Sequence, residues 1–168
     1  DAYALERAKN NGIKTIVLKR KDYSDVASYS KAMAETLKAE NADLVVYAGF
    51  MTILDEQVCN AFPYKMINVH PALIPSFCGQ GFYGLHVHEA ALAKGVKLSG
   101  ATVHFVTEEC DGGPIILQKA VEVKNGDTPE TLQKRIMEEA EWKILPYAVK
   151  LFCDDKIEIR NGKAVVSE

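Results

Sequence analysis

The 168-residue sequence has no closely spaced pair of cysteines, no long apolar run and no excess of basic residues. Cys59, Cys78, Cys110 and Cys153 form no CxxC pair, so we expect free thiols rather than a disulfide framework or a structural zinc site. No stretch approaches the roughly 20 apolar residues that cross a bilayer, and no secretory signal begins the chain. A net charge of −3 gives no field for nucleic acid or an anionic membrane. These absences predict a cytoplasmic protein that binds neither nucleic acid nor membrane.

The sequence also lacks an initiator Met and any strand before residues 1–8, which read as a helix already under way. It has no repeat, low-complexity tract or linker, and its length suits one domain with a substantial core. We therefore expect a single domain over residues 1–168 that is truncated at its N-terminus.

Helix patterns alternate with short apolar runs along the chain. Apolar, partly β-branched runs predict strands at 13–18, 44–48 and 65–69. Apolar spacing and capping residues predict helices at 4–8, from Ser24 or Asp25 to Leu37, at 56–61 after Asp55, and at 86–94 before Gly95. This alternation predicts an α/β fold with an open, mostly parallel Rossmann-like sheet.

The C-terminal part predicts antiparallel pairing. The loop between the expected strands 99–106 and 114–123 is too short for a crossover helix, so these strands should pair antiparallel. The turn Asn161–Gly162 between residues 157–160 and 163–166 predicts a β-hairpin.

A long helix is expected between these two antiparallel pieces. The sequence DTPE at 127–130 combines a capping side chain, Pro in the first turn and a carboxylate three residues on. The helix should run to about Leu145, where Pro146 bends or breaks it.

Two polar side chains interrupt the apolar strand MINVHP. Residues two apart share a face of a strand, so Asn68 and His70 project together, and Pro71 keeps His70 extended. They stand at the C-terminal end of their strand, where open α/β sheets bind ligands. The alternative is structural: His70 would hydrogen-bond a carbonyl and Asn68 would only end the strand.

Asp111 begins the turn DGGP, and a simple turn is one interpretation of it. The preceding strand nevertheless delivers this loop to the sheet edge, where the carboxylate could reach His70, hold its tautomer and raise its pKa. Asn68, His70 and Asp111 would then supply a carbonyl-binding amide, an acid near neutrality and an orienting carboxylate. Ser76 has no GxSxG context, so acyl-enzyme chemistry has little support.

Other polar residues leave further interpretations open. His86 and His88, with His70, His104 and Glu89, could be metal ligands, although zinc sites normally show tighter patterning. Bordering a helix start is the alternative for His86 and His88. Two glutamates three apart on the long helix, Glu138 and Glu141, would suit a cationic or amine ligand or simply form a solvated face.

Four stretches then carry a family resemblance: AGFMTIL (48–54), INVHPALIPSF (67–77), GATVHFVTEECDGGPIILQ (100–118) and GDTPETL (126–132). In these motifs the chain resembles phosphoribosylglycinamide formyltransferase, the 10-formyltetrahydrofolate-dependent enzyme of purine biosynthesis, over nearly its whole length. The resemblance implies the formyltransferase fold and catalytic roles for Asn68, His70 and Asp111.

The resemblance also implies two substrate regions and no metal. Formylfolate would contact Asn68 and two stretches of chain: Met51, Thr52, Ile53 and Leu54, and Thr107, Glu108, Glu109, Cys110 and Asp111. Glycinamide ribonucleotide would meet Pro71, Glu138 and Glu141. The resemblance leaves a homodimer open.

The sequence departs from the family at several points. A first strand and a GxGSN loop that holds the ribonucleotide phosphate do not occur in it, and Glu138 stands where Gln or Lys is frequent. An Arg common in the family aligns near Val26, and the loop 78–83 is longer than in many relatives.

Three other functions compete with a full transferase. Formyltetrahydrofolate deformylase would use water as the acceptor, and a truncated, non-catalytic folate-binding module would catalyse nothing. Methionyl-tRNA formyltransferase would need a further RNA-binding domain, for which the residues after Phe152 are too few.

Overall fold

A computed structural model describes residues 2–50, 52 and 55–167 of the chain. At its centre is a four-stranded sheet in the order β1 (Val45–Tyr47), β2 (Met66–His70), β3 (Leu98–Phe105) and β4 (Ile115–Glu122). β1 and β2 run parallel, whereas β3 is antiparallel to both β2 and β4. The expected α/β class and the antiparallel strands toward the C-terminus are confirmed, and the parallel part of the described sheet is the β1–β2 pair.

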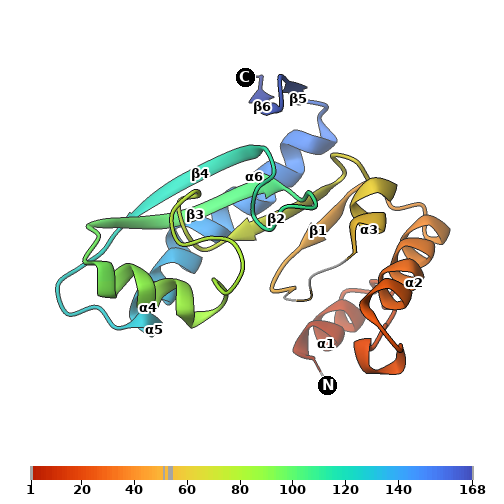
Figure 1. The fold of residues 1–168 in the computed structure, drawn as a ribbon, viewed down its shortest axis with the longest axis horizontal. Coiled ribbons are helices and arrows are strands. Elements are labelled where there is room, and N and C mark those ends of the chain that lie inside the picture. The colour runs from red at the N-terminus through yellow and green to blue at the C-terminus, as the bar shows by residue number, and fades with distance from the viewer. Residues whose placement is uncertain (1, 51, 53–54, 168) are drawn as a thin grey trace.

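Helices flank the sheet in two groups (Figure 1). One group lies beyond β1 and consists of α1 (Tyr3–Asn10), α2 (Val26–Ala39) and α3 (Glu56–Ala61). The other lies beside β2, β3 and β4 and consists of α4 (Leu85–Lys94), α5 (Pro129–Ile136) and α6 (Trp142–Cys153). The chain then forms the expected hairpin of β5 (Ile157–Arg160) and β6 (Lys163–Val166), and both turn residues have positive φ.

Polar side chains begin the helices where the sequence predicts them. The carboxylate of Asp25 accepts a hydrogen bond from the Ser28 amide at 2.7 Å and thereby begins α2. Thr128 caps α5 in the same way, in a reciprocal pair with Thr131. Gly95 ends α4 in the left-handed region, at φ 73°, which an L side chain rarely adopts.

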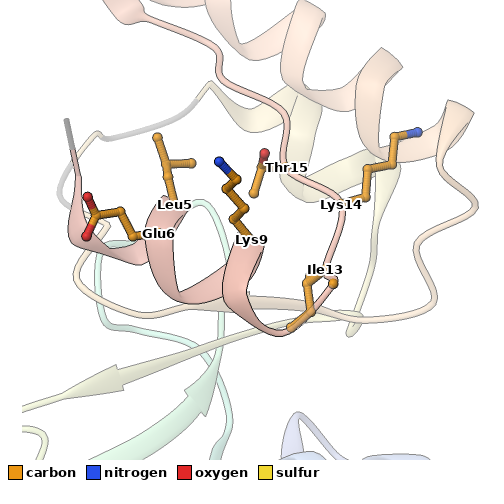
Figure 2. A pocket seen from close by; sticks show the side chains of 7 residues that line it. Leu5, Glu6, Lys9, Ile13, Lys14 and Thr15 are labelled. Carbon is orange, nitrogen blue, oxygen red and sulfur yellow. The ribbon is translucent and has the colours of Figure 1, made fainter.

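The strand expected at 13–18 is absent from the described structure. This segment has no regular secondary structure and belongs to no sheet, and Ile13 and Val17 remain 63% and 54% exposed. β-branched residues favour extended backbone, yet a strand also needs a partner, and no described strand pairs with these residues. An open hollow of about 580 Å³ lies between the segment and α1, with Lys9 and Thr15 among its lining side chains (Figure 2).

The C-terminal helix continues through Pro146, so of the expected bend or break at this residue the break does not occur. Pro146 lies inside α6, and the chain leaves α geometry earlier, in the π-helical segment η2 (Met137–Glu141). Proline removes one N–H donor, and the carbonyl that this donor would have met belongs to Trp142, the first residue of α6. The distortion that we expected at Pro146 therefore occurs in the wider turn just before Trp142.

The main core lies between strands β2 to β4 and helices α4 to α6. Its fully buried members include Ile67, Val103, Leu132 and Ile136. A smaller cluster formed by Ala34, Val58, Phe62 and Met66 joins α2 and α3 to the sheet. Within the described residues, the structure has no helix of the length and apolar character needed to span a membrane.

Candidate active site

Four polar side chains meet where β2 ends against β3. The antiparallel register places Asn68 opposite His104 and His70 opposite Thr102. Directly opposed residues of an antiparallel pair share a face, and so do residues two apart on one strand. Asn68, His70, Thr102 and His104 therefore project from one face, as the sequence predicts for the first two.

Asp111 reaches this group from the loop after β3. Its Oδ2 lies 3.5 Å from Nδ1 of His70, and its Oδ1 lies 3.6 Å from Nε2 of His104. Oδ2 also accepts a hydrogen bond from the amide of Gly79 at 2.9 Å. The two imidazoles and the carboxylate are each at least nine-tenths buried. The structure thus brings Asn68, His70 and Asp111 into one cluster and adds His104 to it.

The turn that carries Asp111 requires its glycines. Asp111 itself has φ 55°, in the left-handed region that aspartate tolerates better than most residues. At Gly113 an added Cβ would lie 1.8 Å from the carbonyl oxygen of Phe105, so any side chain there would displace the loop. The sequence DGG therefore forms a tight turn that brings Asp111 back to the histidines.

The loop that follows His70 is tied to β3 and β4. The hydroxyl of Thr102 donates to the carbonyl of Ala72 at 2.7 Å and accepts from the amide of Ile74 at 3.1 Å. Nε2 of Gln118 donates to the carbonyl of Ile74 at 3.0 Å and lies equally close to the Thr102 hydroxyl. These bonds fix the start of the loop whose Phe77 carbonyl accepts a 2.8 Å hydrogen bond from Nε2 of His70.

Burial decides the charge states of the cluster. Burial lowers the pKa of His70 below its usual 6.5, and the Phe77 carbonyl and Asp111 offset only part of that effect. Asp111 does raise the pKa of His70, as the sequence predicts, but burial outweighs this effect and the net shift is downward. Burial alone would raise the pKa of Asp111, but contacts with His104 and Gly79 and the charges of both histidines lower it to about 2. Near neutral pH the site therefore holds a carboxylate beside a largely neutral imidazole.

The two histidines of the HxH pair lie in different surroundings on α4. His86 is exposed, and its Nδ1 pairs with Glu89 at 3.0 Å. His88 is fully buried, with no hydrogen-bond partner in the described part of the chain for either ring nitrogen, and burial lowers its pKa to about 4. Residues two apart on a helix face different directions, so this pair does not converge as a metal site would require.

The residues expected along formylfolate lie partly within the described structure. Thr52 is half-buried, whereas Met51, Ile53 and Leu54 lie outside the described residues. Thr107, Glu108, Glu109 and Cys110 form the loop that leads to Asp111, and the last three are exposed. This loop borders the His70 cluster.

The residues expected at the ribonucleotide lie in two places. Pro71 follows His70 directly and is half-buried. Both glutamates fall in η2, where the wider turn changes the shared α-helical face that the sequence predicts. Glu138 is exposed and pairs with Lys134 at 3.9 Å, while burial raises the pKa of the half-buried Glu141. No hydrogen bond or ion pair among the described residues joins either glutamate to the His70 cluster.

Sequence reasoning missed His104, Thr102 and Gly79 as parts of this site. The sequence suggests His104 only as an additional metal ligand. The two-residue spacing of Thr102 and His104 in the same apolar strand was the available signal, since it repeats the spacing of Asn68 and His70. The contact of Gly79 with Asp111 depends on the folded loop and has no local signal.

Comparison with known proteins identifies the family. The family described as formyl transferase matches residues 1–149. The chloroplastic phosphoribosylglycinamide formyltransferase of Arabidopsis thaliana is 40% identical over 163 residues, which are 96% of this chain and 55% of that protein. The chain thus spans about half the length of that relative.

Solved structures agree in fold. Glycinamide ribonucleotide transformylase 1 from Symbiobacterium toebii has a TM-score of 0.93 and 40% identity, over 100% of this chain and 76% of that one. A formyltetrahydrofolate deformylase from Pseudomonas syringae pv. tomato has a TM-score of 0.81 and 28% identity, over 98% and 53% of the two chains. The resemblance seen in the sequence motifs is confirmed, and the chain belongs to the formyl transferase family.

Proposed function

We propose that this chain carries the catalytic site for transfer of a formyl group from 10-formyltetrahydrofolate to the amine of glycinamide ribonucleotide, in purine biosynthesis. The observation that carries the proposal is the convergence of Asn68, His70 and Asp111 at the end of β2, in a formyl transferase whose relatives are named for this reaction. The deformylase relative is 28% identical, against 40% for the transformylase from Symbiobacterium toebii.

The cluster has the groups that this reaction needs. The amine nitrogen bonds to the formyl carbon, the bond from that carbon to the folate nitrogen breaks, and one proton moves from the amine to that nitrogen. Asn68 would donate a hydrogen bond to the formyl oxygen as its negative charge develops. His70 would pass the proton toward the folate nitrogen, and Asp111 would orient His70 and stabilise its charged form.

We place the two substrates on opposite sides of this cluster. Formylfolate would lie along residues 51–54 and the loop 107–111, of which residues 108–110 are exposed. Glycinamide ribonucleotide would lie toward Pro71 and the η2 glutamates. A homodimer and a cytoplasmic location remain predictions.

The fate of a labelled formyl group tests the proposal. The full-length protein is incubated with isotopically labelled 10-formyltetrahydrofolate, with and without glycinamide ribonucleotide, and labelled product and free formate are separated. We expect the label in formylated ribonucleotide and little formate. Formate release at the same rate without the amine would instead identify a deformylase. Folate binding without either product would identify a non-catalytic module.

A further inference from the structure

Each histidine beside Asp111 is held through its other ring nitrogen by a backbone carbonyl. Nε2 of His70 lies 2.8 Å from the Phe77 oxygen, and Nδ1 of His104 lies 2.9 Å from the Phe105 oxygen. A carbonyl oxygen only accepts, so these two nitrogens carry hydrogen in every protonation state. The nitrogens that face Asp111 are therefore the ones that gain or lose a proton.

The two facing nitrogens differ in their partners. Nε2 of His104 lies 3.3 Å from Nδ2 of Asn68, within hydrogen-bond distance, but 3.6 Å from Asp111. Nδ1 of His70 faces Oδ2 of Asp111 at 3.5 Å. An amide nitrogen only donates, so the bond from Asn68 exists only while Nε2 of His104 has no proton.

Counting hydrogen bonds then places the extra proton on one ring. With the proton on Nδ1 of His70, that nitrogen points a donor at Asp111 and His104 still accepts from Asn68. With the proton on His104, that ring in turn points a donor at Asp111, at 3.6 Å, but the bond from Asn68 is lost and a lone pair of His70 faces the carboxylate. The first arrangement satisfies more buried groups and so has the lower free energy.

We propose that His104 is a positioning residue, which stays neutral, accepts a hydrogen bond from the Asn68 amide, and so directs the labile proton of the cluster to Nδ1 of His70. One N–H of Asn68 then donates to His104, which fixes the orientation of the amide. Its second N–H is thereby directed toward the position of the formyl oxygen. This role rests on the proposed function, but the proton placement can be measured without activity.

Three other titratable groups around the cluster, those of His88, Cys78 and Cys110, supply no competing charge. His88 of α4 is close enough to His70 for their charges to interact, and its pKa of about 4 keeps it neutral above that pH. Burial raises the pKa of the Cys78 and Cys110 thiols near Asp111, so both remain uncharged near neutral pH.

Two substitutions separate the two nitrogens of His104. The short amide introduced by His104→Asn retains a donor near the position of Nδ1 but loses the acceptor for Asn68. The longer side chain introduced by His104→Gln extends far enough to place an amide oxygen near the position of Nε2. His86→Gln is the matched control, because His86 is exposed and lies outside the cluster.

The experiment follows ring-nitrogen NMR signals of the ¹⁵N-labelled 168-residue chain between pH 4 and pH 8. We expect His104 to remain neutral with its proton on Nδ1, while His70 gains its proton on Nδ1. In His104→Asn the freed Asn68 amide competes for Asp111, so the titration midpoint of His70 should fall by about half a pH unit or more. His104→Gln and His86→Gln should leave that midpoint within about 0.3 unit of the wild type.

Detection of a doubly protonated His104 while His70 is neutral would overturn the positioning role and leave the proposed function intact. If a full-length protein showed the predicted protonation pattern but transferred no formyl group, the proposed function would be overturned and the positioning role would stand. If His104→Asn does not fold, the wild-type ring-nitrogen signals alone decide the proton placement. In an active full-length protein, we further expect His104→Asn to lower kcat about tenfold with little change in KM, and His104→Gln to retain most of it.

Discussion

Most of the buried apolar side chains lie between β2 and α6, whereas the described residues from α1 to β1 contribute only Tyr29 and Ala34 to them. Leu132 and Ile136 are completely buried, while Ile16 and Val46 remain 46% and 39% exposed. Neither α1 nor the short 3₁₀ turn Arg20–Asp22 contains a buried residue. The cluster of Asn68, His70, His104 and Asp111 stands entirely on the first of these two regions, so its geometry should not depend on the second.

The contrast is visible in an open groove of about 610 Å³ beside β1. The groove is lined by the 14–18 segment, α2, Glu40 and residues 45–50, and most of its lining side chains are apolar. The hydroxyl of Tyr47 is buried there without a hydrogen-bond partner among the described residues, and burial raises its pKa. Regions with few buried apolar contacts open at low free energy, so residues 2–50 should exchange their amide hydrogens faster than β3 does.

The largest expected effect is on activity, and it should follow from changes in the region from β2 to α6 but not from changes in the region from α1 to β1. In the full-length protein, His70→Ala or Asp111→Asn should lower formyl transfer by roughly 10²–10⁴ without unfolding, because each removes a group of the proton path. The control Lys14→Ala changes an exposed residue of the other region and should leave turnover unchanged. Near-normal rates in both cluster variants would sink the assignment. The pKa of His70 lies below 6.5, so the wild-type rate should change with pH below that value. This pH dependence should be absent from His70→Ala.

The next largest effect separates them by stability. Leu132→Ala should lower the free energy of unfolding by about 2–5 kcal/mol, since a buried side chain leaves a cavity. Ile16→Ala should cost less than about 0.5 kcal/mol, because its side chain is already half exposed. Urea unfolding of both variants measures the difference. Equal losses would mean that residues 2–50 are packed as tightly as the core.

The histidine buried in α4 makes the first region sensitive to acid. The pKa of His88 is about 4 in the folded chain, against about 6.5 when unfolded. Above pH 6.5 both states are neutral; as the pH falls from 6.5 to 4, only the unfolded chain takes up the proton. This linkage should remove about 3 kcal/mol of stability over that range. His70 contributes in the same direction, because its pKa is also lowered.

His88→Leu tests this assignment. At pH 8 the variant should be close to the wild type in stability, and at pH 4.5 it should be the more stable of the two. The exposed His86→Leu should show no such crossover. Parallel curves for wild type and His88→Leu across the range would contradict the linkage.

Local chemistry was enough to predict much of the fold and part of the site. Caps such as Asp25 and Gly95 act within a few residues, so the sequence contains their full cause. That Asn68 and His70 project from the same face follows from strand alternation alone. The part played by His104 depends on the register between β2 and β3, which joins residues 36 positions apart.

Two of the three failures depend on contacts that are distant in sequence, and the third depends on a residue four positions away. The 13–18 segment has the composition of a strand, but strand formation depends on a partner elsewhere in the chain. The direction of the His70 pKa shift depends on how completely the ring is buried, which no local pattern reports. Pro146 removes the hydrogen bond to the carbonyl of Trp142, so the helix distorts before Trp142 rather than at the proline itself.

The smallest expected effect concerns an ion pair of the exposed region. Lys14 and Glu40 approach to 2.5 Å, but the lysine side chain is 68% exposed and the glutamate 39%. Water and salt screen such a pair, so Glu40→Gln should change the free energy of unfolding by less than about 1 kcal/mol. The change should shrink further at about 0.5 M salt, where the screening length is short.

The contrasting pair Asp127 and Arg135, also at 2.5 Å, is mostly buried in the other region, so the cost of Asp127→Asn should persist at that salt concentration. A Glu40→Gln loss that is equally large and equally resistant to salt would show that the pair is shielded from solvent in solution, and that the two regions differ less than their exposed side chains indicate.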